Sequence, residues 1–312
     1  MRTVFFGSPT FAVPTLEALR SAGHDVVLVV SQPGKPVGRK AEITDPPVAA
    51  LAKSLGMHVF QPPTLKDDAA FARLAEAHAD VFVVAAYGKI LAQRVLDLPR
   101  LGCLNVHGSL LPRWRGASPV QASILAGDEK TGVSIMKMEA GMDTGPVYTT
   151  RETEIGEEED SASLGARLAA MGADALVETL NSLEGEEGRT PVPVPQDEAR
   201  ATYCPKIARE DARVDWTRPA AELVRRARAF TPWPGLFTTR RKTRVKLAGL
   251  SLEAGRPGAR TGDVLEAGSR VVVACGEGAV AVATLQAEGR KALSAADFVR
   301  GERVAAGETW GE

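Results

Sequence analysis

Cysteine, histidine and long apolar runs are all scarce in this 312-residue chain. The three cysteines, Cys103, Cys204 and Cys275, are odd in number and far apart, which argues against a disulfide framework or a thiolate metal site. No stretch approaches the roughly 18 apolar residues of a membrane span, and the run "MRTVFFGSPTF" is too short and interrupted for a signal peptide. These absences predict a cytoplasmic protein without disulfides or membrane spans.

Several common nucleotide and hydrolase motifs are also missing. The first expected strand-to-helix turn, "FGSPTFA", has one glycine where a dinucleotide site has G-x-G-x-x-G, and no G-x-x-x-x-G-K-[ST] occurs. The G-x-S-x-G nucleophile motif is absent, and the four histidines have no metal-ligand spacing. The sequence therefore leaves NAD, ATP, serine-hydrolase and metal chemistry unsupported.

Apolar runs typical of buried strands alternate with amphipathic helical stretches over the first 150 residues. This alternation predicts a mostly parallel sheet covered by helices on both faces. We expect strands at residues 3–7, 25–32, 58–61, 80–88 and 102–108, with helices at 14–23, 47–56, 67–77 and 91–98 between them. A helix at 118–127, strands at 132–139 and 145–155 and a long helix at 161–183 should complete the domain.

A charged and then proline-alternating segment, residues 184–202, follows the long helix. Such a segment favours an extended, semi-rigid connector, so we expect a first domain at 1–189, a linker at 190–205 and a second domain at 206–312. After a helix at 219–230, short β-like runs separated by glycine turns predict a small antiparallel, OB-like β-barrel.

The two predicted domains differ in charge. Residues 206–312 contain 19 Lys and Arg against 13 Asp and Glu, whereas residues 1–205 contain 19 against 26. A basic domain joined to an acidic one suggests that the basic part binds a polyanion, although a solvated arginine-rich surface would have the same composition.

Two polar residues end the expected strand "CLNV". Asn105 and His107 are two positions apart, so both side chains leave the same face of an extended strand. Asp143, between Gly141 and Gly145, follows another apolar run, and ligands of open α/β sheets bind outside the carboxyl ends of strands. If these loops meet, Asp143 could hold His107 protonated or accept a proton itself. The alternatives are a hydrated strand exit and an ordinary turn aspartate.

These residues lie within longer motifs that resemble a known family. "LNVHGSLLPRWRGASPVQ" followed by "GVSIMKMEAGMDTGPV" resembles the signature of the 10-formyltetrahydrofolate-dependent formyltransferases. The stretches "FFGSPTFAVPTLEAL", "QPGKPVGR", "AAYGKIL", "DARVDW" and "AFTPWPG" are similar to the branch of that family whose acceptor is the methionine on initiator tRNA. The resemblance implies a Rossmann-like formyltransferase fold followed by an OB-like domain, with 10-formyltetrahydrofolate as co-substrate and no metal.

The resemblance also assigns roles to individual positions. It makes Asn105, His107 and Asp143 the catalytic residues of a direct amine attack on the formyl group. The positions that it implies for folate binding are Tyr87, Gly88, Ser109, Leu110, Leu111 and Pro112, although plain core burial is an alternative for Leu110 or Leu111.

Contacts to initiator tRNA are implied at two places, in a monomeric enzyme. The polar, proline-rich loop at 31–47 carries Lys35, Arg39 and Lys40, and the start of the basic domain carries Lys206 and Arg209. Arg113 and Arg115 could either shape their loop or touch a substrate. Other readings remain open: a family member acting on an amino-sugar nucleotide, a formyltetrahydrofolate hydrolase, or a non-catalytic RNA-binding module.

Overall fold

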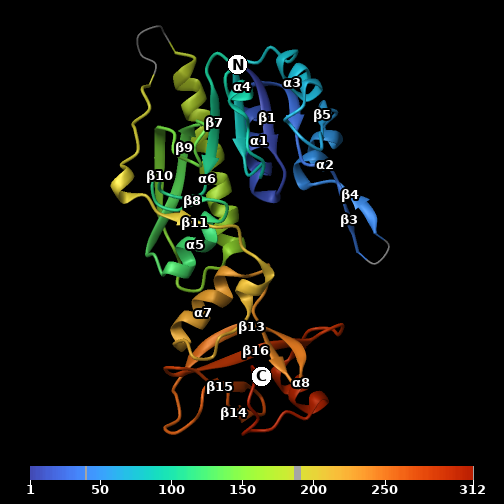
Figure 1. Cartoon of the computed structure of the whole chain (residues 1–312), viewed down its shortest axis with the longest axis vertical. Coiled ribbons are helices and arrows are strands. Elements are labelled where there is room, and N and C mark those ends of the chain that lie inside the picture. The colour runs from blue at the N-terminus through green and yellow to red at the C-terminus, as the bar shows by residue number, and fades with distance from the viewer. Residues whose placement is uncertain (39–40, 186–190, 312) are drawn as a thin grey trace. The chain divides into compact units, whose positions relative to one another are not determined.

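The computed structural model describes residues 1–38, 41–185 and 191–311, which fold into two compact units (Figure 1). The first unit comprises Met1–Pro119, Lys130–Glu154 and Gly165–Pro205, and the second comprises Val120–Glu129, Ile155–Leu164 and Lys206–Glu312. The predicted boundary between residues 189 and 190 lies outside the described residues.

The first unit is built on a seven-stranded sheet in the order β10-β9-β7-β6-β1-β2-β5. Five strands run parallel, as the alternating pattern predicted: β1 (Arg2–Gly7), β2 (Asp25–Val30), β5 (Val59–Phe60), β6 (Val81–Ala85) and β7 (Cys103–His107). The last two strands, β9 (Lys130–Lys137) and β10 (Val147–Glu154), are antiparallel to their neighbours. The sheet is therefore Rossmann-like and mostly parallel.

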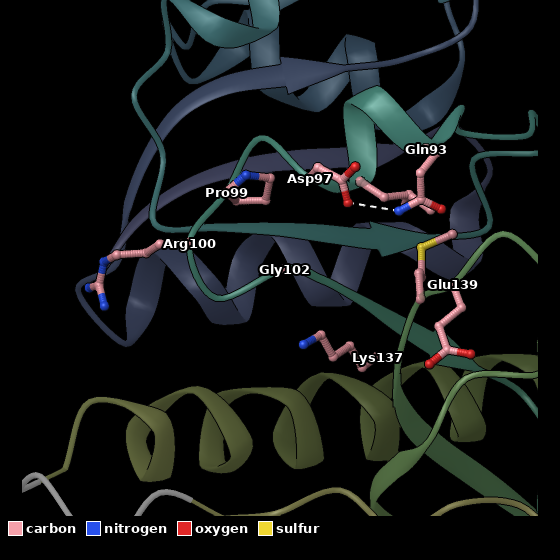
Figure 2. A pocket seen from close by; sticks show the side chains of 9 residues that line it. Gln93, Asp97, Pro99, Arg100, Gly102, Lys137 and Glu139 are labelled. Atoms are coloured by element: carbon pink, nitrogen blue, oxygen red, sulfur yellow. Dashed lines mark hydrogen bonds between the residues drawn. The ribbon is translucent and has the colours of Figure 1, made fainter.

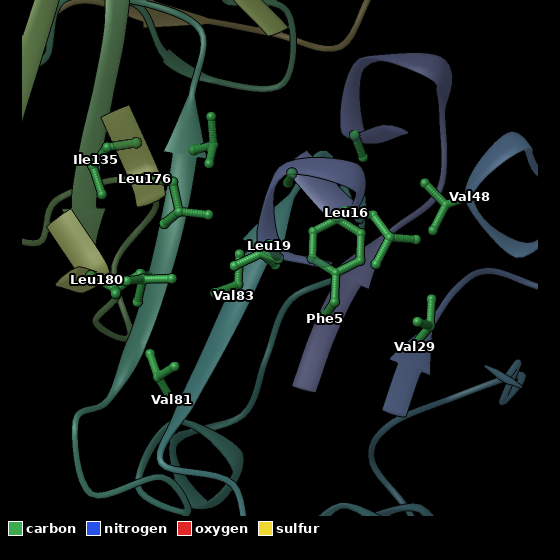
Figure 3. Packing of buried hydrophobic residues seen from close by; sticks show 14 of the residues in the cluster. Phe5, Leu16, Leu19, Val29, Val48, Val81, Val83, Ile135, Leu176 and Leu180 are labelled. Carbon is green, nitrogen blue, oxygen red and sulfur yellow. The ribbon is translucent and has the colours of Figure 1, made fainter. Parts of the chain in front are cut away.

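Helices pack on both faces of this sheet, because its strands are apolar on both faces. One core cluster contains residues of α1 (Val13–Ser21), α2 (Pro47–Ser54) and α6 (Ser161–Leu183). Figure 3 shows Leu16, Leu19 and Val48 near the strand residue Phe5, and Leu176 farther along the cluster. A second cluster contains residues of α3 (Asp68–Ala75) and the short α4 (Gln93–Leu96).

Strand β7 shows how the two faces position the site. Leu104 and Val106 belong to the cluster with α6, whereas Cys103 belongs to the cluster with α3 and α4. Since side chains alternate along a strand, Asn105 and His107 share the face of Cys103. The apolar side chains Leu104 and Val106 thus anchor β7 in the core, and the polar side chains Asn105 and His107 are available for binding or catalysis.

Shorter elements complete the first unit. The 3-10 turn η1 (Thr10–Ala12) precedes α1, and the polar loop predicted at 31–47 contains a hairpin of β3 (Lys35–Val37) and β4 (Glu42–Thr44). Within the predicted linker, Val194 bridges to Val147, η2 (Glu198–Arg200) forms one 3-10 turn, and β11 (Tyr203–Cys204) pairs in parallel with β8 (Arg115–Gly116). Residues 191–205 are therefore bound along the first unit.

The second unit contains an antiparallel, curled sheet of OB-like type. Its strands follow the order β12-β13-β16-β15-β14, and β17 also pairs with β16. Their bounds are Phe237–Arg240 (β12), Thr243–Glu253 (β13), Val264–Ala267 (β14), Val271–Ala274 (β15), Ala279–Ala287 (β16) and Leu293–Ser294 (β17). The helical segments are α5 (Pro119–Ala126), η3 (Arg209–Ala212), α7 (Ala220–Ala229) and α8 (Ala295–Glu302).

None of the helices in the described ranges combines the length and the apolar character needed to cross a membrane.

The close approach of α6 to the sheet at Gly172 gives a test of the packing. A Cβ on Gly172 would lie 2.5 Å from Cγ1 of Val106, whereas a Cβ on Gly165, in the same helix, would meet nothing within 4 Å. We expect Gly172→Leu to lower the free energy of unfolding by about 1–3 kcal/mol through overpacking against β7.

Gly165→Leu is the matched control for that substitution. It should raise the free energy of unfolding by roughly 0.5–1 kcal/mol, because it removes a helix-interior glycine without a clash. Urea denaturation measures both variants, and equal effects would contradict the tight packing of α6 on β7.

Candidate active site

His107 is the last residue of β7 and is only 5% exposed. Its Nε2 lies 2.9 Å from the carbonyl oxygen of Trp114, and its Nδ1 lies 3.7 Å from Oδ2 of Asp143. A carbonyl oxygen can only accept, so Nε2 donates the hydrogen of the bond to Trp114. The separation between Nδ1 and Oδ2 of Asp143 is longer than a hydrogen bond, so Nδ1 remains accessible to a ligand at this site.

Asn105 precedes His107 on the same face of β7 and is 9% exposed. Met136 of β9 is its partner across the sheet, and Val84 of β6 is its partner on the other side. In the part of the chain that the structure describes, no protein group hydrogen-bonds to the Asn105 amide. A largely buried amide in this state is a donor available to a ligand.

Asp143 reaches His107 by a route that the sequence did not indicate. The expectation that both residues follow strands at one sheet edge is wrong, because β9 runs antiparallel to β7 and its terminal Lys137 is paired with Leu104. The loop between β9 and β10 carries Asp143 beside His107 instead. There the backbone N–H of Gly116 donates to Oδ2 of Asp143 over 2.8 Å.

Gln196 is a site residue that sequence reasoning missed. Its Nε2 donates to the carbonyl oxygens of Asp143, at 2.8 Å, and Gly145, at 2.7 Å. Its Oε1 accepts from Nε of Arg115 over 3.0 Å. Gln196 lies in a segment that reads as a plain connector, so no signal in the sequence singled it out.

Arg115 shapes the loop after β7. Its side chain is fully buried, and its guanidinium donates to both carboxylate oxygens of Glu198, at 2.6 and 2.9 Å, and to the hydroxyl of Tyr203 at 3.3 Å. Hydrogen bonding to Glu198 raises the pKa of Arg115, and the same bonds lower the pKa of the Glu198 carboxyl. Arg113 is exposed instead, with its guanidinium 4.4 Å from the centre of the Trp114 ring.

The predicted folate segment, residues 109–112, is fixed by hydrogen bonds to β9. Ser109 donates through Oγ to the carbonyl of Arg113 and accepts at its own carbonyl from Oγ of Ser134. The Ser134 hydroxyl accepts in turn from the N–H of Leu111. The Ser109 side chain is thereby engaged within the protein. Leu110 and Pro112 are partly exposed, and Leu111 is buried.

Tyr87 and Gly88 follow β6, the neighbour of β7. Tyr87 is buried edge-on against Phe6, and burial raises the pKa of its hydroxyl to about 12. Its carbonyl accepts from Nε2 of Gln32 over 2.7 Å, and Gly88 has a φ of +76°. This backbone conformation suits glycine and turns the chain sharply at the strand end.

The predicted tRNA-binding cations occupy exposed positions where they are described. Lys35 is exposed on β3, and Lys206 and Arg209 are exposed at the start of the last segment of the second unit. Arg39 and Lys40 lie outside the described residues.

Several other cations of the second unit are already engaged within it. Arg226 donates to the carbonyl of Asp211, and Arg228 donates to that of Gly156. Arg240 is buried against the carboxylate of Glu308. The exposed cations on and beside the curled sheet include Arg241, Lys242 and Lys246.

A cavity of about 260 Å³ lies elsewhere in the first unit (Figure 2). It is lined by residues of α4 and by Arg100, Gly102, Lys137 and Glu139, beside the start of β7 and the end of β9. Asn105, His107 and Asp143 do not line it. Among residues 1–38, 41–185 and 191–311, no group of three His, Cys, Asp or Glu side chains is arranged to hold a metal ion.

Two family models match the chain. The formyl transferase model covers residues 1–180, and the model of the formyl transferase C-terminal domain covers residues 206–303. Among curated proteins, a methionyl-tRNA formyltransferase of Thiobacillus denitrificans is 47% identical over all of both chains. One from Ruegeria pomeroyi is 48% identical over 98% of this chain and 99% of its own.

Solved structures of similar fold are more distant in sequence. Methionyl-tRNA formyltransferase from Clostridium thermocellum matches with a TM-score of 0.55 at 15% identity, over 90% of this chain and 98% of its own. HypX from Aquifex aeolicus in complex with tetrahydrofolic acid matches with a TM-score of 0.66 at 19% identity, over 96% of this chain and 47% of its own. At these identities the matches establish the fold.

The buried guanidinium of Arg115 gives a stability test of the loop beside this site. Arg115→Met keeps an unbranched aliphatic stem in the buried position but removes the guanidinium and its charge-assisted hydrogen bonds to Glu198. The thermal midpoint should fall by roughly 3–6 °C. Arg200→Met, on the same segment but exposed, should shift it by no more than about 1 °C. Similar midpoints for the two variants would show that the bonds of the buried Arg115 to the exposed carboxylate of Glu198 are not needed for stability.

Proposed function

Because the chain belongs to the formyl transferase family, we propose that it transfers the formyl group of 10-formyltetrahydrofolate to the α-amino group of methionine on initiator tRNA. The observation that carries the proposal is the convergence of Asn105, His107 and Asp143 at the end of β7. The relatives named methionyl-tRNA formyltransferase, which match over nearly the whole chain, support the choice of acceptor.

Formyl transfer to an amine needs donors for a developing oxyanion. When the amine attacks the formyl carbonyl, the tetrahedral intermediate carries negative charge on oxygen and positive charge on nitrogen. The Asn105 amide, which has no protein partner in the described part of the chain, donates to that oxygen. Protonated His107 is the second donor through Nδ1–H, because its Nε2–H is already bonded to the Trp114 carbonyl and Asp143 lies beyond hydrogen-bond distance of Nδ1. A preorganised donor of this kind typically contributes about 10²–10³ to the rate.

The nitrogen of the intermediate must lose a proton before the folate amine leaves. Asp143 accepts it, directly or through a water molecule, and also stabilises the charge on His107. The bond between the formyl carbon and the folate nitrogen then breaks, and the leaving nitrogen takes up the proton from Asp143, directly or through water, to give tetrahydrofolate. A free α-amine has a pKa of about 8, so a useful fraction is neutral near pH 7 without a strong base. The site therefore needs neither a covalent nucleophile nor a metal to activate the amine.

The proposed folate-binding surface is formed by residues 109–112 and the turn after β6. Bonds to Ser134 rigidify the loop, so its backbone groups can pair with the polar edge of the pterin while Leu110 and Pro112 contact its apolar part. Tyr87 and Gly88 form the adjoining wall. The Ser109 hydroxyl donates to the carbonyl of Arg113, so its contribution is to hold the conformation of the loop and not to contact the folate.

The acceptor tRNA is bound through its phosphates by exposed cations. On the second unit, Lys206 and Arg209 bind phosphates, and the segment from Lys35 to Lys40, in which Arg39 is the key residue, contacts the acceptor end. An amino-sugar nucleotide or water as acceptor would leave this basic surface without a role. A cytoplasmic monomer is part of this proposal, and one chain contains Asn105, His107 and Asp143.

A formylation assay with charged initiator tRNA and 10-formyltetrahydrofolate tests the proposal. Asp143→Asn keeps the acceptor for Gly116 N–H but removes the base, so kcat should fall by about 10²–10⁴ with tRNA affinity nearly unchanged. Asp174→Asn, exposed on α6, is the control and should retain full activity. Absence of product from the wild-type protein at saturating substrates would refute the function.

Salt dependence tests the tRNA surface. Each phosphate contact adds about 0.7–0.9 to the negative slope of log affinity against log salt, so Lys206→Ala and Arg209→Ala should each make the slope shallower by about 1. Arg270→Ala is the control, because that cation already pairs with Glu253 and Glu266. If the slope of log affinity against log salt is the same for the Lys206→Ala, Arg209→Ala and Arg270→Ala variants, Lys206 and Arg209 do not contact tRNA phosphates.

A further inference from the structure

The Asp143 loop is held at its backbone by one side chain from the segment 191–205. Both hydrogens of the Gln196 amide are used on this loop, on the carbonyls of Asp143 and Gly145, and its oxygen accepts from Arg115. The amide of Gln196 thus fixes the directions of two peptide groups of the loop, the one after Asp143 and the one after Gly145.

The loop needs such a restraint because its backbone is unusual. Asp143 has a φ of +52°, in the left-handed region that costs energy for residues other than glycine. Gly145 in the same loop is closely packed, since a Cβ there would lie 1.8 Å from the carbonyl oxygen of Lys137. The direction of the Asp143 side chain follows from this backbone conformation. Peptide groups held by Gln196 therefore determine whether Oδ2 reaches Gly116 and His107.

Gln196 is itself attached to the body that carries Gly116. Arg115, which donates to Gln196, is fully buried and bonded to Glu198, and Gly116 pairs with Cys204 through the short β8–β11 ladder. A Cβ on Gly116 would lie 2.2 Å from the Cys204 carbonyl oxygen, so the two segments are in close contact. The Asp143 loop is consequently held at its carboxylate and at its backbone by groups of one rigid assembly.

We propose that Gln196 is a positioning residue for Asp143, which sets the carboxylate against His107 without touching the substrates. The inference rests on the proposed role of Asp143 in formyl transfer. It predicts a loss in the chemical step, because a carboxylate displaced from the imidazole neither supports its charge nor accepts the amine proton in the right geometry.

The decisive variant is Gln196→Glu. It keeps the size of the side chain and the acceptor for Arg115, but a carboxylate cannot donate, so it repels both loop carbonyls. In single-turnover formylation the rate constant should fall by about 10–100-fold. The steady-state KM for tRNA and for the folate should stay close to the wild-type values. The thermal midpoint of the variant should also stay close to that of the wild type. Gln196→Met, which removes the hydrogen bonds without adding charge, should give a loss in the same direction.

A matched control and a double variant separate positioning from general structural damage. Gln93→Glu, at an exposed position on α4, likewise turns an amide that donates to an oxygen, here of Asp97, into a carboxylate, and it should leave the rate unchanged because it lies outside the site. If Gln196 acts through Asp143, adding Gln196→Glu to Asp143→Asn should lower the residual rate by less than about 2-fold. The same 10–100-fold loss in both backgrounds, or no loss in the wild-type background, would overturn the inference.

These outcomes are distinct from failure of the proposed function. A wild-type protein that forms no formylated product refutes the function itself. An active wild-type enzyme with an unaffected Gln196→Glu variant refutes the positioning role alone.

Discussion

The buried guanidinium of Arg115 is the interaction on which the candidate site depends. A charged group without solvent must be paired, and Glu198, Gln196 and Tyr203 provide its partners. Meeting that requirement draws a segment some 80 residues later in the chain onto the loop after β7. The Gly116 N–H and the Gln196 amide, which hold Asp143, are in place as a consequence.

The two faces of strand β7 have different roles, one in packing the core and the other in the candidate site. Leu104 and Val106 bury one face of β7 under α6, where Gly172 permits close approach, so the strand is fixed firmly. The other face carries Asn105 and His107 at low exposure. A polar pair on so rigid a support is preorganised, which is the condition for donors that stabilise a developing charge.

The basic character of residues 206–312 is only partly available for binding. Arg226, Arg228 and Arg240 satisfy carbonyl and carboxylate groups inside the second unit, and their charge contributes to the long-range field more than to direct contacts. Lys206 and Arg209 are exposed, and the proposed function assigns the phosphate contacts to them.

The sequence by itself determined the parallel strand pattern, the polar pair on β7, the curled second sheet and the family motifs. Each of these depends on residues close together in the chain, whose periodicity reports the face that they occupy. The antiparallel direction of β9, the burial of Arg115 and the contacts of Gln196 with the Asp143 loop were decided only by the tertiary structure. Those features depend on which distant segments meet, and a proline-rich stretch such as 191–205 has no periodicity to indicate that its amide and carboxylate are required elsewhere.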